Sequence, residues 1–278
     1  MLFRKREHFI TKIMIILVLL VVVLWVVIPI WIVVTNSFKP TLEIRRVPPS
    51  IIFTPTLQHF RDTISVEAFG SYFVNSLIVA GTTTLISIVF GSLGGYGLWL
   101  ARKTWGKKVS NLMLIGRLVP AITILIPFFV MLHTVGLIGT YVGPILAHSS
   151  VNLPFVIWLM LGFMRAIPEE LFESGLIDGA SRMKILFRIY MPMLSAAIGA
   201  AFILSMQFSW NELLFSLQLT GLDTYTLPVG VARYVGAVSV NWGQGSAAAT
   251  ITMLPIIIIG FVMQKYFVSG MTAGAVKE

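Results

Sequence analysis

The sequence contains no cysteine and little charge, and both absences narrow what the protein can be. Because none of the 278 residues is cysteine, disulfides and thiolate zinc sites are excluded. Only 11% of the residues are charged, whereas a soluble domain carries about 25%. A Gly-x-x-x-x-Gly-Lys-Ser/Thr phosphate loop is also missing, so the chain is not expected to hydrolyse ATP itself. The four histidines are scattered, and we expect no metal and no cofactor on this chain.

Apolar residues take the place of the missing charge. Residues 13–34 form a run of 22 residues without a charged side chain, which as a helix is about 33 Å long and crosses a bilayer core of about 30 Å. Arg4, Lys5 and Arg6 before this run resemble the start of a signal peptide. The run is too long for that and no small-residue cleavage site follows, so we expect a retained span.

Similar runs along the chain predict an all-α integral membrane protein with six transmembrane helices in a single membrane domain, 1–278. The expected spans are 13–34, 73–100, 112–132, 141–163, 193–217 and 247–267. Glycines are frequent in the second span, and small residues allow helices to approach closely in lipid. They are Gly81, Gly91, Gly94, Gly95 and Gly97. We therefore expect this span in the interior of the bundle.

The distribution of Lys and Arg predicts the orientation of the spans. With the N-terminus inside, the inner segments hold fourteen basic residues and the outer segments five, with Arg117 inside the third span. Basic residues collect on the cytoplasmic side of membrane proteins, so both termini are expected in the cytoplasm. This bias also explains the net charge of +9 without a nucleic-acid partner, and it makes membrane lipid the expected surrounding.

The stretch between the fourth and fifth spans, 165–192, is too long for a simple loop and its composition is ordered. Pro168 and the acids that follow it are typical of a helix start. Asp178-Gly179 indicates a turn, and a second helical stretch then leads to Pro192. The segment is therefore predicted to be a cytoplasmic helix-turn-helix. From the pattern alone it could lie on the lipid headgroups or form a docking surface for a cytoplasmic partner.

The same stretch resembles the cytoplasmic signature loop of permeases from binding-protein-dependent importers. That pattern is Glu-Ala-Ala, three residues, Gly, nine residues, Ile, one residue, Leu-Pro. Here Glu173 begins it, Gly179 and Ile189 fall at the required spacing, and Met191-Pro192 ends it. The departures are Ser174-Gly175 for Ala-Ala and Met for Leu. All of them are small for small or apolar for apolar.

Further sequence segments along the chain resemble the carbohydrate-uptake branch of these ABC importers, whose type member is the maltose permease pair. They are YFVNSLIVAGTTT in the second span, RLVPAITILIP from Arg117, IPEELFESGLIDGAS from Ile167, FSWNELLFSLQLT from Phe208, TLPVG from Thr226 and the tail QKYFVSGMTAGAVKE. The resemblance covers nearly the whole chain and is greatest to the smaller, six-span partner of the pair.

The resemblance implies the assembly in which the chain works. A second homologous permease completes the pore, two ATPase subunits bind ATP and Mg, and an extracytoplasmic solute-binding protein delivers a sugar-type substrate. The location implied is a bacterial or archaeal plasma (inner) membrane. The signature loop enters a cleft on an ATPase subunit as a coupling helix and drives alternating access. The residues carried over to that coupling contact are Glu173, Ser174, Gly175, Asp178, Gly179, Ala180 and Ser181.

Polar residues inside spans are the default candidates for a translocation pathway. Asn211 and Glu212 are expected in the outer half of the fifth span, and Gln207, one helical turn before Asn211, shares the face of Asn211. Ser149 and Asn152 in the fourth span, and Arg117 about 9 Å into the third, are further candidates. Each of these side chains could instead join neighbouring helices or lie near an interface.

An ion-gradient-driven secondary transporter is the alternative function. It predicts inverted repeats and buried carboxylates at mid-membrane, and neither an internal repeat nor an Asp within the six spans is found. A membrane-embedded enzyme is disfavoured because no paired carboxylates, metal cluster or activated nucleophile is visible.

Overall fold

The computed structural model describes residues 2–66, 69–234 and 240–273, and every regular element in these ranges is helical. This confirms the expected all-α fold class. The residues group into two compact units. The first unit combines Met1–Glu67 with Val231–Ile251, and the second combines Ala68–Gly230 with Thr252–Glu278. The single domain expected over 1–278 stays a prediction.

The first unit contains the N-terminal span and the segment after it. Its helices are α1 (Leu2–Phe38), α2 (Thr41–Ile44), α3 (Gln58–Val66) and the first part of α14 (Trp242–Ala273). The apolar stretch of α1 buries none of its side chains in this chain, as expected of a helix surrounded by lipid or by another subunit. α3 approaches the start of α14 so closely that a Cβ on Gly243 would overlap the ring of His59.

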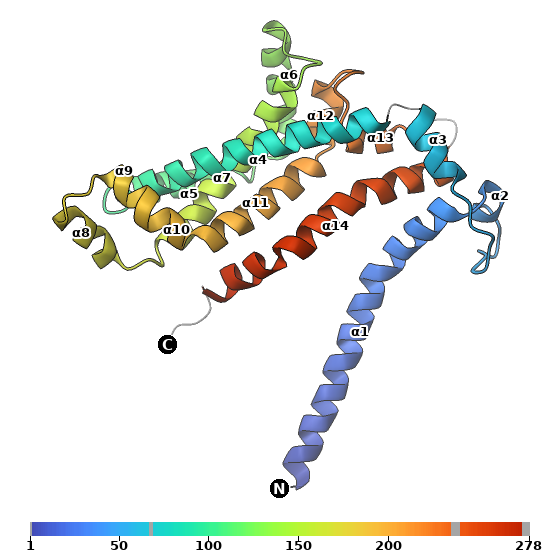
Figure 1. The fold of residues 1–278 in the computed structure, drawn as a ribbon, viewed down its shortest axis with the longest axis horizontal. Helices are drawn as coiled ribbons and strands as arrows, with labels where there is room; N and C mark the ends of the chain where they lie inside the picture. The colour runs from blue at the N-terminus through green and yellow to red at the C-terminus, as the bar shows by residue number, and fades with distance from the viewer. Residues whose placement is uncertain (1, 67–68, 235–239, 274–278) are drawn as a thin grey trace. The chain divides into compact units, whose positions relative to one another are not determined.

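The second unit is built on three helices that run side by side, α4 (Phe69–Leu100), α7 (Val142–Met164) and α11 (Ser195–Trp210) (Figure 1). α4 and α7 touch through small residues. A Cβ on Gly91 would lie 2.5 Å from Val156 Cγ1, and one on Gly95 would lie 3.0 Å from Met160 Cβ. The interior packing expected for the second span is therefore found at these glycines, whereas Gly81 and Gly97 have open space beside them.

The remaining helices of the second unit connect or extend these three. They are α5 (Gly106–Gly116), α6 (Ala121–Thr134), α8 (Glu169–Ile177), α9 (Arg182–Ile185), the π-helix η1 (Leu186–Tyr190), α10 (Met191–Met193), α12 (Leu214–Leu219) and α13 (Leu227–Ala232). α13 ends in the first unit. The tail residues 274–278 lie outside the described residues.

Within the described part of the chain, four helices are long and apolar enough to cross a membrane, and two bent pairs bring the number to six if each pair is one span. The expected third span, 112–132, is such a pair: α5 and α6 meet at 93°. The bend lies at 117–120, where Pro120 disfavours helical backbone in the residue before it. Arg117 therefore lies at the bend, where it caps α5, and not within a straight span.

The expected fifth span, 193–217, is also interrupted. The helices over 182–193 and α11 meet at 77° near Leu194, and α11 ends at Trp210, before the short α12 begins at Leu214. Asn211 and Glu212 therefore lie in a helix break and not inside a continuous helix.

Candidate functional site

Residues 168–190 fold into a helical hairpin, called here the signature hairpin because it carries the motif. Pro168 precedes α8, and Glu169 and Glu170 occupy its first turn, where the helix dipole favours acids. Gly179 turns the chain with φ of +74°, a value that glycine adopts without steric cost. Ser181 caps α9 by accepting a hydrogen bond from the Lys184 backbone at 3.3 Å. The local signals thus account for each part of the hairpin.

The predicted coupling residues divide between the inside and the outside of the hairpin. Gly175 is buried, and a Cβ there would lie 3.0 Å from Ile185 Cγ1 and 3.4 Å from Ile189 Cδ1. Gly175, which replaces the second alanine of the motif, and the motif isoleucine Ile189 therefore serve close packing between the two helices. Ala180 is half-buried, whereas the outer surface is formed by Glu173, Ser174, Asp178, Gly179 and Ser181.

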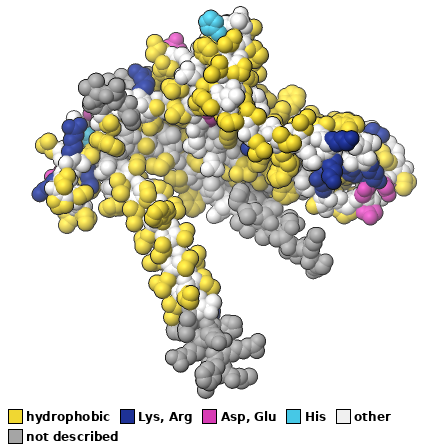
Figure 2. Space-filling model, turned by 180° about the vertical axis from the view of Figure 1, so that it is seen from behind, with side chains coloured by type: hydrophobic (Ala, Val, Ile, Leu, Met, Phe, Trp, Pro, Cys, Tyr) yellow, Lys and Arg dark blue, Asp and Glu magenta, His cyan; other side chains and the backbone are white. Residues whose placement is uncertain are grey.

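That outer surface mixes charge with apolar side chains. Ile177, at the end of α8, is 85% exposed, and Leu171 and Leu176 are exposed on the same helix. Figure 2 shows Lys, Arg, Asp and Glu side chains gathered at the end of the second unit where α8 and α9 lie. Exposed apolar residues within a charged rim are typical of a protein interaction site.

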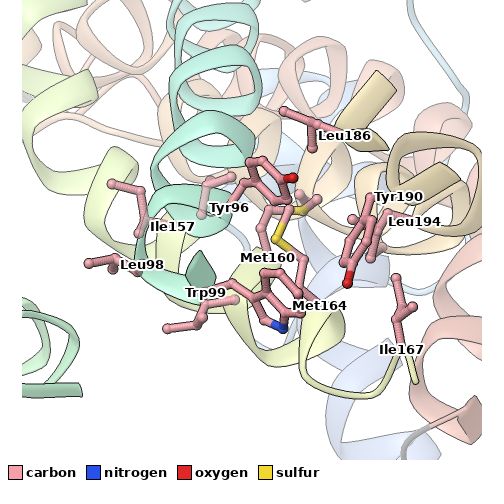
Figure 3. Close-up of a cluster of buried hydrophobic side chains, with 14 of the residues drawn as sticks. Tyr96, Leu98, Trp99, Ile157, Met160, Met164, Ile167, Leu186, Tyr190 and Leu194 are labelled. Atoms are coloured by element: carbon pink, nitrogen blue, oxygen red, sulfur yellow. The ribbon is translucent and has the colours of Figure 1, made fainter. Parts of the chain in front are cut away.

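Aromatic packing fixes the hairpin to the ends of α4 and α7 (Figure 3). Tyr96 and Trp99 of α4 and Tyr190 of η1 are all buried, and the ring centroids of Trp99 and Tyr190 lie 5.1 Å apart. Phe172 of α8 meets Trp99 edge-on at 5.0 Å. The Tyr96 hydroxyl donates to the carbonyl of Arg182 at 2.8 Å. Because both helices of the hairpin contact the same ring cluster, hairpin and span ends form one packed body.

A charged latch adds to this packing at the start of α8. Arg102 lies over the Trp99 ring, 3.8 Å from its centroid, and forms an ion pair with Glu169. Lys103 donates to the same carboxylate at 3.0 Å. The hydrogen bond from Lys103 lowers the pKa of the Glu169 carboxyl below its usual value, and the charge of Arg102 acts in the same direction.

A second cluster of polar residues lies between α7, α11 and α12. His148 is fully buried; its Nε2 lies 2.9 Å from Glu212 Oε2 and its Nδ1 lies 2.7 Å from Ser209 Oγ. Because an ionised carboxylate only accepts hydrogen bonds, the imidazole donates through Nε2. The Glu212 carboxylate also accepts from the backbone N–H groups of Phe215 and Ser216, each at 3.1 Å or less.

The other predicted pathway residues take different places. Asn152 donates to Ser205 on α11, and so joins two helices, and Ser149 is buried beside it on α7. Gln207 and Asn211 are exposed one turn apart, and the Asn211 amide donates to the Gln207 carbonyl at 3.0 Å. The Arg117 guanidinium lies 4.7 Å from the centre of the Phe155 ring. The structure therefore places Glu212 in contact with α7 and leaves Gln207 and Asn211 exposed.

His148 was missed as a site residue by sequence reasoning, which treated the histidines as scattered. A signal was available, because His148 and Asn152 are one turn apart in α7 and their partners Ser209 and Ser205 are one turn apart in α11. Two polar pairs at helical spacing in two apolar spans indicate helices that meet through these faces. Among the described residues no cluster of His, Cys, Asp or Glu suits a metal ion.

Comparison with known proteins places this architecture in a class of transport subunits. The model of the binding-protein-dependent transport system inner membrane component matches residues 87–273. A chain of a bacterial ABC transporter involved in the import of alginate has the same fold, with a TM-score of 0.78 at 19% identity, covering 94% of this chain and 98% of that one. The MetNI methionine ABC transporter gives a TM-score of 0.60 at 17% identity, covering 77% and 98%.

Named relatives are similar over most of their length. The melibiose/raffinose/stachyose import permease MelC of Bacillus subtilis is 32% identical, with 80% of this chain and 81% of that protein covered. The arabinooligosaccharides permease AraQ of the same organism is 31% identical over 87% of both chains. The trehalose/maltose permease MalG of Thermococcus litoralis is 30% identical over 82% and 84%.

The chain belongs to the family of inner membrane components of binding-protein-dependent transport systems. It is a multi-pass transmembrane subunit of an ABC importer, as the signature motif predicted, and its role is transport and not catalysis. Family membership overturns the alternative of an ion-gradient-driven carrier.

Proposed function

We propose that this chain is one of two permease subunits that form the transmembrane route of an importer for a sugar or sugar derivative. The observation that carries the proposal is the family match together with relatives named for melibiose, arabinooligosaccharide and trehalose or maltose import. The chain is matched along nearly its whole length, so the similarity extends to the spans as well as to the motif.

The proposed assembly contains a second homologous permease, two ATPase subunits that bind ATP and Mg, and an extracytoplasmic binding protein. A solved neighbour is an alginate transporter in complex with an alginate-bound periplasmic protein. The proposed location is a bacterial or archaeal plasma membrane with both termini in the cytoplasm. The excess of Lys and Arg in the segments assigned to the inside supports this orientation.

The signature hairpin is the proposed docking element for an ATPase subunit. Its exposed surface, centred on Ile177 and Asp178, offers the contact, while the buried ring cluster joins the hairpin to α4 and α7. Because tightly packed groups move together, closure of the ATPase pair would displace the hairpin and the span ends as one rigid body. ATP hydrolysis would thereby reorient the spans.

The proposed sugar route passes Gln207 and Asn211. Both are uncharged amides, exposed in the last turn of α11 and at the break that follows it, within the expected fifth span, where a polar surface is unfavourable unless it faces water or protein. Amide groups can donate to and accept from sugar hydroxyls. Glu212 lies behind them, and contributions from Ser149, Asn152 and Arg117 remain predictions.

Affinity purification of this chain from its native host in mild detergent, with identification of the bound subunits, tests the proposal. The expected result is a second permease and two ATPase copies per complex, with a binding protein captured after gentle crosslinking. The sugar carried by that binding protein identifies the substrate. Recovery of the chain alone or as a homodimer, with no ATPase after crosslinking, would contradict the proposed function.

A further inference from the structure

The break in the fifth span is not caused by a helix-breaking residue. Residues 206–219 contain neither Gly nor Pro, and Leu213 and Leu214 are good helix formers, yet 211–213 leave the helix. Breaks in helices arise from Pro, from small residues, or from a group that replaces the backbone acceptor. Here that group is the Glu212 carboxylate.

Glu212 breaks the helix by accepting hydrogen bonds that belong to the backbone. In a continuous helix the N–H groups of Phe215 and Ser216 would bond to the carbonyls of Asn211 and Glu212. Instead both bond to the Glu212 carboxylate. The two carbonyls are thereby left outside the helical ladder, and among the described residues the amides of 212–214 have no backbone acceptor.

His148 holds the carboxylate in this position. A charge inside a membrane span is costly unless it is paired, and the buried imidazole supplies the partner from α7. Ser209 fixes the other ring nitrogen, and the Ser216 hydroxyl lies 3.3 Å from both His148 Nε2 and Glu212 Oε2. The pair thus connects α7, the end of α11 and the start of α12, with its charge turned inward.

We infer that His148 and Glu212 are positioning residues that hold the fifth span open at 211–213 and present uncharged backbone and amide groups to the sugar. The inference rests on the proposed function, since the ligand is the sugar carried past Asn211. Carbonyls released from a helix are free to accept hydrogen bonds, as the unwound segments that coordinate ions in other transporters illustrate, and sugar hydroxyls can donate to them. The Glu212 side chain is 10% exposed and lies against His148, so the amide of Asn211 and the released carbonyls, and not the carboxylate, form this surface.

The test uses hydrogen–deuterium exchange of the intact complex in lipid nanodiscs, read on peptides covering 207–219. The variant is His148→Leu with Glu212→Leu, because replacing both members of a buried pair by apolar residues leaves no unpaired charge and is often tolerated. Without the carboxylate the helix closes through 211–213. We expect up to three additional protected amides in this peptide, together with loss of uptake of the sugar found on the binding protein.

The direction in which the exchange rate changes distinguishes a positioning role of the His148–Glu212 pair from a role in packing alone. A merely structural role predicts faster exchange in the variant, because packing is lost, whereas closure of the break predicts slower exchange. Asn152→Ala with Ser205→Ala is the matched control, since it removes another polar contact between α7 and α11 away from the break. Exchange over 212–214 should stay as in the native chain.

Two outcomes overturn the inference. One is exchange in the double leucine variant that is as fast as, or faster than, in the native complex. The other is slower exchange with unchanged KM and maximal rate of uptake. Failure of the proposed function is recognised separately, because the native complex would then lack its ATPase or binding protein whatever the exchange shows.

Discussion

The signature hairpin and the broken fifth span both interrupt regular helix, but they are held by different forces. The hairpin combines local signals, namely Pro168, a glycine turn and a serine cap, with a buried cluster of aromatic rings. The break at 211–213 has no breaker residue and depends on one buried pair, His148 and Glu212. Packing suits a part that has to move rigidly, whereas a paired charge can open backbone groups inside an apolar span.

Blocking the outer surface of the hairpin should have the largest effect. At Gly179 a Cβ would meet nothing within 4 Å, so Gly179→Trp projects from the turn and should abolish sugar uptake while the chain still inserts. Membrane fractionation and uptake by whole cells measure both. Gly179→Asn is the control, because Asn tolerates positive φ, and it should retain most uptake. Normal uptake with Trp would remove this surface from the coupling contact.

Removing the centre of the ring cluster should test whether packing holds the hairpin. Trp99 is 2% exposed, and Trp99→Ala should lower the free energy of unfolding by about 3–5 kcal/mol. Thermal unfolding of the purified complex measures the loss. Trp105 on the next loop is 57% exposed, and its replacement by Ala should change stability little. Equal effects of the two substitutions would contradict the proposed anchor.

Filling the space at Gly175 should have a smaller effect of the same kind. Gly175→Ala brings a methyl to 3.0 Å from Ile185, and overpacking of this degree costs about 1–3 kcal/mol. Gly162→Ala in α7, where space is open, should instead stabilise slightly because alanine favours helix. Ile185→Val added to Gly175→Ala should recover part of the loss. If Ile185→Val does not restore stability, the contact between Gly175 and Ile185 is not the cause of the stability lost in Gly175→Ala.

The charged latch should give the smallest effect, and a pH-dependent one. The pKa of Glu169 is lowered in the folded protein, so its contribution is present above the ordinary carboxyl pKa and is lost as pH falls through the folded value. The protection of the amides of residues 167–172, measured as exchange corrected for its intrinsic pH dependence, should therefore fall slightly on acidification. The same corrected protection in Glu169→Gln should be insensitive to pH over this range. A native protein as insensitive as this variant would show that the latch adds nothing.

The turns of the hairpin can be inferred from nearby sequence, whereas the break in the fifth span cannot, for a physical reason. The turn and capping residues of the hairpin act on backbone within a few residues of themselves, so the sequence alone indicates their effect. They are Pro168, Asp178-Gly179 and Ser181. Glu212 also caps its own helix, but a carboxylate survives there only because His148 lies opposite, 64 residues earlier in the chain. No residue near Glu212 in the sequence indicates that His148 is its partner.

The amino-acid sequence by itself determines the number of apolar segments, the all-helical class, the family motif and the turn at Gly179. Each of these depends only on segment length, hydropathy or local backbone preference. The tertiary structure alone decided that Gly175 packs inside the hairpin, that Arg117 stands at a 93° bend, and that His148 and Glu212 meet. Each of these depends on which helices touch and at what depth, and close contact between distant spans is set by packing in three dimensions.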